Sequence, residues 1–126
     1  MKITDLKPTI VWKFFHQVTQ VPRPSKKEGK MIEFLESFAK EYKIAIKKDE
    51  AGNLLMSKPA TPGMEDRPVV VLQSHMDMVC EKNNGTKHDF DNDPIETIVD
   101  GEWLRANGTT LGADNGIGVA LSLIHI

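Results

Sequence analysis

Four consecutive apolar residues, Val-Val-Val-Leu at positions 69–72, constrain the fold of this sequence more than any other feature. Three of the four are β-branched, a side-chain type that favours strands. The run does not alternate with polar residues, which is typical of a central strand covered on both faces. It leads directly into His75 and Asp77, so a buried strand is predicted to carry two chemically versatile side chains at its carboxyl end.

The rest of the chain predicts a mixture of helices and strands. Apolar residues recur at helical spacing in three places, and short β-prone runs are separated by turn residues such as Asp49, Gly52 and Asn53. Helices are expected at 9–19, from a Ser25–Glu28 capping box to about Tyr42, and from about Ile117 onward; strands are expected at 44–46, 54–57, 69–72, 97–99 and 102–105. This order predicts an α/β domain with a mixed β-sheet.

Charge, the N-terminal residues and cysteine content indicate which partners and which cellular compartment to expect. The net charge is −2 and the basic residues are scattered, which argues against nucleic acid and anionic membrane. The first fifteen residues include Asp5 and Pro8, so they predict neither a signal peptide nor a membrane span. Cys80 is the single cysteine, so no intrachain disulfide can form, and we expect a reducing, cytoplasmic compartment.

His75 and Asp77 form the first candidate site. Ligands of open α/β sheets bind beyond the carboxyl ends of strands, and residues i and i+2 of an extended chain share a face. A neutral imidazole is a good zinc ligand, and a neighbouring carboxylate can fix its tautomer. The same short pattern also fits a structural histidine followed by a solvated aspartate at a capped strand end.

Asp114, in the glycine-bounded stretch TTLGADNGIG at 109–118, forms the second candidate site. A carboxylate at the mouth of such a turn could bridge metal ions. The alternatives are a turn residue, a helix N-cap, or a calcium or phosphate loop, although the residues that usually accompany such loops are missing. Other candidates receive no catalytic role: Cys80 as a buried structural thiol, and His16, His88 and His125.

Taken together, these stretches resemble a known family. The chain contains, in order, PRPSKKEGK, DEAGNLL, SHMDMVCEKN, HDFDNDPI and DGEWLRANGTTLGADNGIG. Over residues 5–120 it resembles the aminoacyl-histidine dipeptidases, also called Xaa-His or cytosol non-specific dipeptidases, of the co-catalytic di-zinc exopeptidase family. The resemblance implies the N-terminal part of a three-layer α/β/α catalytic domain that is cut inside a helix.

The resemblance also implies roles for individual residues. His75 and Asp114 would be metal ligands, with Asp114 bridging two Zn²⁺ ions for which Co²⁺ or Mn²⁺ could substitute. Asp77 would be the catalytic-site residue that orients His75. The peptide bond between Asp114 and Asn115 would be cis. Gly112 and Gly116 would give the backbone room for the turn.

Several features of the family pattern are missing from this sequence. The resemblance implies a Glu-Glu pair, two further zinc ligands and a lid domain that could mediate a homodimer, and none follows residue 120. The intact parent is expected to hydrolyse Xaa-His dipeptides, including carnosine-like substrates, and the chain alone is expected to be inactive.

The last six residues, LSLIHI at 121–126, can be encoded by CTGTCTCTTATACACATC, a transposase end sequence used in library adapters. We therefore expect a native segment at 1–120 and a non-native, adapter-derived tail at 121–126. Because the segment 69–72 would then lack neighbours, we expect the isolated chain to be insoluble or molten.

Two alternative functions remain open. Another member of the wider family, such as a tripeptidase or a deacylase, would share the His75–Asp77 pattern, although the residues HMDMVCEKN favour the dipeptidase. A natural short protein of the same fold could instead bind only a metal or a peptide.

Overall fold

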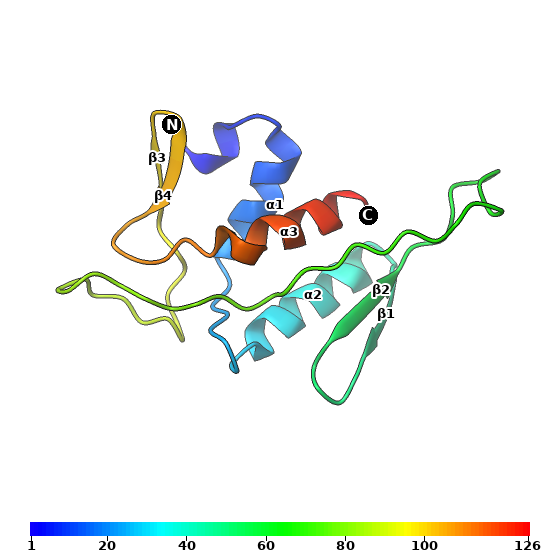
Figure 1. Cartoon of the computed structure of the whole chain (residues 1–126), viewed down its shortest axis with the longest axis horizontal. Helices are drawn as coiled ribbons and strands as arrows, with labels where there is room; N and C mark the ends of the chain where they lie inside the picture. Colours follow the sequence, from blue (N-terminus) through cyan, green and yellow to red (C-terminus); the bar gives the residue numbers. More distant parts are fainter.

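A computed structural model describes all 126 residues of the chain. Three helices and two hairpins are joined by long irregular segments (Figure 1). The elements in chain order are η1 (Ile3–Asp5), α1 (Thr9–Thr19), α2 (Gly29–Glu41), β1 (Ala45–Lys48), β2 (Leu54–Ser57), β3 (Thr97–Asp100), β4 (Trp103–Ala106) and α3 (Ala113–Ile124). The predicted helices and the predicted hairpin strands are confirmed to within a few residues at each end.

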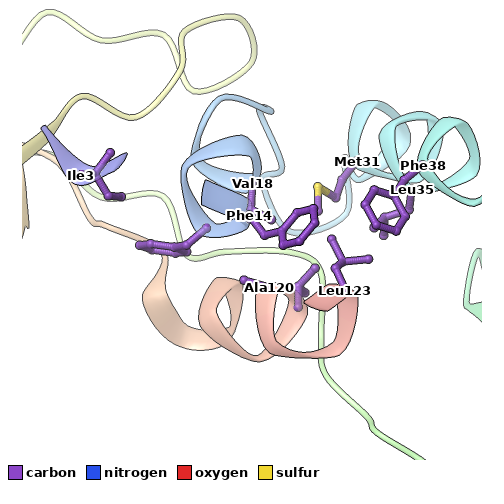
Figure 2. Packing of buried hydrophobic residues seen from close by; sticks show 10 residues of the cluster. Ile3, Phe14, Val18, Met31, Leu35, Phe38, Ala120 and Leu123 are labelled. Carbon is purple, nitrogen blue, oxygen red and sulfur yellow. The ribbon is translucent and has the colours of Figure 1, made fainter. Parts of the chain in front are cut away.

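The three helices meet in one hydrophobic core. α1 packs most closely against α3, and α2 lies beside α1, where Met31, Leu35 and Phe38 complete one end of the cluster (Figure 2). Phe14 of α1 and Phe38 of α2 form an edge-to-face pair with ring centroids 5.7 Å apart. The buried cluster consists of Ile3, Phe14, Phe15, Val18, Met31, Leu35, Phe38, Val119, Ala120 and Leu123. The apolar stripes predicted from helical periodicity are therefore the faces that make the core.

The strands form two separate two-stranded antiparallel sheets, β1 with β2 and β3 with β4. In the first hairpin the Asp49 carboxylate accepts hydrogen bonds from the backbone of Ala51 (3.0 Å) and Asn53 (2.8 Å). Gly52 follows with a φ of 88°, a conformation that glycine adopts without a steric penalty. The turn chemistry predicted from the sequence is thus present.

The prediction of a strand at 69–72 is wrong for this chain. No hydrogen-bonded partner strand lies beside Val69–Leu72, and these side chains are between 54 % and 90 % exposed. In Figure 1 this segment crosses the molecule as an unpaired trace without an arrow. A strand needs a neighbour to satisfy its backbone groups, and both sheets of the chain are complete without this segment. The mixed sheet expected from the sequence is therefore not formed within these 126 residues.

The capping box predicted at Ser25 is also wrong. Helix α2 is preceded by Glu28, and no side chain caps its first turn. The Ser25 hydroxyl instead donates to the Asp77 carboxylate at 2.5 Å. Hydrogen bonds to charged groups are stronger than those to neutral ones, so the carboxylate is the better partner for Ser25.

The segment 121–126 continues α3 to Ile124, and Leu123 is buried in the core. That this segment is not native remains a prediction, which sequencing of the native locus would test. A stop codon directly after LSLIHI in genomic DNA would contradict it. No helix of the chain is long and apolar enough to cross a membrane.

Candidate metal centre

His75 lies between two carboxylates. Its Nδ1 is 3.0 Å from Asp77 Oδ1, and its Nε2 is 2.9 Å from Asp114 Oδ1. The hydrogen bond with Asp114 is the main reason why the pKa of His75 is raised, and burial opposes this effect. The structure thus brings together all three residues that the sequence predicted for the site, although Asp114 lies 39 positions from His75.

Asp77 is fixed from its other side by Ser25. The Ser25 hydroxyl donates to Asp77 Oδ2, while His75 approaches Oδ1. The hydrogen bond from Ser25 is the largest cause that lowers the pKa of Asp77, and the neighbouring imidazole adds to it. With both oxygens engaged, the Asp77 carboxylate holds the His75 ring in one orientation, as a residue behind a metal ligand should.

Asp114 lies at an irregular start of α3. Gly112 has a φ of 71°, and the peptide bond between Asp114 and Asn115 is cis, as predicted from the resemblance. The Asn115 side-chain oxygen accepts a hydrogen bond from the Gly118 backbone at 3.1 Å, which caps the regular part of the helix. This turn leaves the Asp114 carboxylate 95 % exposed and free to bind a ligand.

Arg23, which was not predicted from the sequence, lies directly beneath the site. This residue is 1 % exposed, and it belongs to the loop between α1 and α2. Its guanidinium donates to the backbone carbonyls of Met76 (3.2 Å), Asp77 (3.2 Å) and Gly112 (2.7 Å). A lone arginine between two prolines gives no periodic signal, so no pattern in the sequence could have placed it.

Arg23 also explains why glycines flank Asp114. A Cβ added at Gly112 would lie 2.5 Å from the Arg23 guanidinium and 2.8 Å from the Met78 sulfur. A Cβ at Gly116 would lie 2.8 Å from the same guanidinium and 2.9 Å from the Phe15 ring. The room that the two glycines were predicted to provide is therefore occupied by a buried arginine.

The donors present fit zinc in chemistry but not in number. Imidazole nitrogen and carboxylate oxygen are both common zinc ligands, and structural sites use four of them. Two donors on a tetrahedral zinc ion lie about 3.3–3.6 Å apart, so the 2.9 Å between His75 and Asp114 would need only a small opening. No group of three or more potential ligands occurs in the chain. The chain therefore offers two of the four donors that a zinc site would use.

The remaining candidates lie outside this site. Cys80 is half-buried, burial raises the pKa of its thiol, and no second cysteine is present. The His88 ring packs edge-to-face on Phe90 with centroids 4.5 Å apart. His125 is in the last turn of the chain, where its carbonyl accepts a hydrogen bond from Lys58 at 2.9 Å.

A histidine held by one carboxylate and facing another, on part of an α/β domain, is the arrangement expected of a metal-dependent hydrolase. Comparisons with known proteins agree with that class. No protein-family model matches the chain. Its sequence is 49 % identical, over 122 residues, to the cytosol non-specific dipeptidase of Escherichia coli (strain K12). This alignment covers 97 % of the chain and 25 % of the relative.

Solved structures give the same result. The crystal structure of aminoacylhistidine dipeptidase from Vibrio alginolyticus matches with a TM-score of 0.94 and 46 % identity, over 99 % of this chain and 26 % of that one. A tripeptidase from Staphylococcus aureus matches with a TM-score of 0.72 and 24 % identity, over 90 % of this chain and 30 % of that one, which shows a shared fold alone. The chain is thus homologous to about a quarter of these dipeptidases, and the predicted α/β fold class is confirmed.

Proposed function

We propose that this chain forms part of the catalytic centre of a zinc-dependent dipeptidase. The observation that carries the proposal is the position of His75, held by Asp77 at Nδ1 and facing Asp114 at Nε2. Homology to two dipeptidases gives the reaction class. The remaining zinc ligands and the general base would come from parts of the parent protein that lie outside these 126 residues.

Each residue of the candidate site would have a distinct task in hydrolysis. Asp77 keeps the proton of His75 on Nδ1, so that the Nε2 lone pair is free for a metal ion. Asp114, which is exposed beside it, offers a second ligand and would bridge two ions. Zinc bound there would supply a Lewis acid and a water of lowered pKa. Ser25 holds Asp77 and so keeps the ring in place while substrate binds.

The substrate class and cellular setting are further parts of the proposal. The names of the relatives favour dipeptides, with Xaa-His and carnosine-like peptides as the first substrates to test, and a cytoplasmic location. Zn²⁺ is the expected metal, with Co²⁺ or Mn²⁺ as substitutes. A homodimer would form through a lid domain of the parent. Neither nucleic acid nor a membrane is expected as a partner.

The main test of the proposal compares two aspartates in the full-length parent. Asp114→Ala should abolish dipeptide hydrolysis and lower the zinc content, because it removes a ligand. Asp77→Ala should lower activity by about 10- to 100-fold with less metal loss, because Asp77 acts through His75. Metal analysis of both purified variants decides: equal zinc content in Asp114→Ala and the wild type would remove Asp114 from the metal centre.

The isolated chain should not hydrolyse dipeptides and should bind zinc weakly, since it offers two of the four usual ligands. Turnover of Ala-His with added zinc should match buffer, and calorimetry should give low affinity or none. A nanomolar site, or turnover that disappears with His75→Ala, would contradict the proposal and favour a self-sufficient metal-binding module instead.

A further inference from the structure

Three segments far apart in the sequence converge on the guanidinium of Arg23. The residue itself belongs to the loop between α1 and α2, two of its acceptors are at 76–77, and the third is at 112. The backbone adds to this junction: Met78 N donates to Arg23 O at 3.0 Å, and Ser25 N donates to Met78 O at 3.3 Å. Arg23 is therefore joined to residues 76–77 by its side chain and to the adjacent Met78 by its main chain.

The acceptors of Arg23 are adjacent to the candidate ligands. Met76 directly follows His75, and Gly112 precedes Asp114 by two residues. One planar guanidinium, with nitrogens at fixed separation, thus holds the two segments that bring His75 and Asp114 within 2.9 Å. A lysine could not reproduce this arrangement, because its ammonium is a single point donor.

A buried arginine is a costly way to join two loops. All its acceptors are neutral carbonyls, its Nε has no hydrogen-bond partner, and no carboxylate pairs with it directly. Burial lowers the pKa of Arg23, which reflects the desolvation cost, while the nearby charge of Asp77 offsets part of it. Packing alone would not require a buried charge in this place.

We propose that Arg23 is a positioning residue that sets the spacing between His75 and Asp114 and so prepares the metal site. This inference rests on the metal-site function proposed above. It predicts that loss of the guanidinium impairs the site more than its effect on folding can explain. Arg23 touches no reacting atom and acts entirely through the carbonyls that flank the two ligands.

The test separates positioning from stability with a matched control. Arg23→Met, Arg23→Lys and Thr19→Val are made in the full-length parent protein, which is expected to supply the remaining zinc ligands. Thr19 is as buried as Arg23 and donates to His16 O at 2.7 Å, but the site does not include it. Thermal melts give the stability of each variant. NMR signals of the His75 ring, followed during titration with Zn²⁺ alone, give its metal affinity.

We expect Arg23→Met to weaken zinc binding by about 10-fold or more, as is typical for residues behind a ligand. Arg23→Lys should fall in between, and Thr19→Val should keep the parent affinity although it lowers the melting temperature. Arg23→Met with unchanged affinity and a lower melting temperature would overturn the inference. Should Arg23→Met fail to fold, Arg23→Lys decides in the same way: unchanged affinity would contradict positioning.

A metal-free measurement keeps the inference separate from the proposed function. At fixed pH the Nε2 chemical shift of His75 reports its contact with Asp114. In Arg23→Met, or in Arg23→Lys if only that variant folds, this shift should move toward the value in Asp114→Ala. Failure of the full-length parent protein to bind zinc through His75 would count against the metal role alone. An unchanged shift in the Arg23 variant would refute positioning whether or not zinc binds.

Discussion

Val18 in α1 and Val70 in the extended segment carry the same side chain, yet Val18 is 0 % exposed and Val70 is 81 % exposed. Val18 lies where α1 packs against α3, whereas Val70 has no second surface to pack against. Burying a valine contributes about 1.5–3 kcal/mol, so the two positions differ greatly in what they add to stability. Whether a valine is buried therefore depends on whether a partner surface for it is part of the same chain.

The same difference separates the helical body from the long segment 58–82. In the body, aromatic and aliphatic side chains from three helices interlock (Figure 2). In the extended segment, apolar residues face water until the chain reaches Met76 and Met78, where the body holds it again. The candidate metal centre lies at this boundary, because His75 is the last residue before the Arg23 junction.

The strongest test of this comparison is a pair of truncations. Phe15→Ala should lower the free energy of unfolding by about 3–5 kcal/mol, because it opens a cavity in the core. Val70→Ala should change it by less than about 0.5 kcal/mol, because the side chain is exposed. Urea unfolding followed by near-UV circular dichroism measures both changes if the wild-type chain unfolds cooperatively, and a transition without cooperativity would instead confirm the molten state expected from the sequence. Similar losses in the two variants would mean that Val70 is buried in solution.

The fold could be predicted from the sequence where the packing partners of a segment lie within the chain, and not where they are missing. Helix periodicity located the faces of α1 and α2 because their partners lie within the chain. The VVVL run was assigned to a central strand because its composition fits one, but composition carries no information on missing neighbours. His75, Asp77 and Asp114 were predicted as site residues from their motifs, whereas Arg23 was missed because a buried polar junction depends on tertiary geometry alone.

Two glycines with left-handed backbone sharpen the comparison further. Gly112→Ala should lower the free energy of unfolding by about 2–4 kcal/mol. The added methyl group would collide with Arg23 and Met78, and alanine is strained at the positive φ of this position. Gly63 lies within the segment 58–82, and no atom lies within 4 Å of the position that a Cβ would take there. Gly63→Ala should therefore cost only about 1–2 kcal/mol, which is what a side chain at a φ of 84° entails. Chemical denaturation of the two variants checks this order, and equal costs would mean that Arg23 moves aside freely.

A pH effect is expected where the extended segment joins the body. The folded-state pKa of His75 is raised, chiefly by Asp114, so its contribution to stability is complete below the unfolded pKa. That contribution is lost as the pH rises through the folded value. It should be below about 1 kcal/mol, because His75 is half exposed and water screens the pair.

The measurement compares unfolding free energies at pH 5.5 and 8.5, with a chelator present, in the wild type and in Asp114→Asn. The two proteins differ only at residue 114, so the difference between their pH profiles isolates the pair. Identical profiles would show that His75 and Asp114 do not interact in solution.

The smallest effect on stability should come from Val69→Lys/Val71→Lys. Both side chains are exposed, so the unfolding free energy should change by less than about 0.5 kcal/mol. Self-association should nevertheless fall, because charges discourage pairing along an open backbone edge. Sedimentation at several concentrations measures this. Unchanged association would mean that the chain associates through another surface. Exposed Leu55 and Trp103 would then be the next residues to replace.

The packing of α1 against α3 has a consequence for how the chain is made. α1 ends at Thr19 and α3 begins at Ala113, so a ribosome working at about 5–20 residues per second needs roughly 5–20 s to deliver the second helix after the first. During that interval the apolar face of α1 has no α3 to cover it. Proteolysis of ribosome-stalled chains should therefore cut within α1 until α3 has emerged.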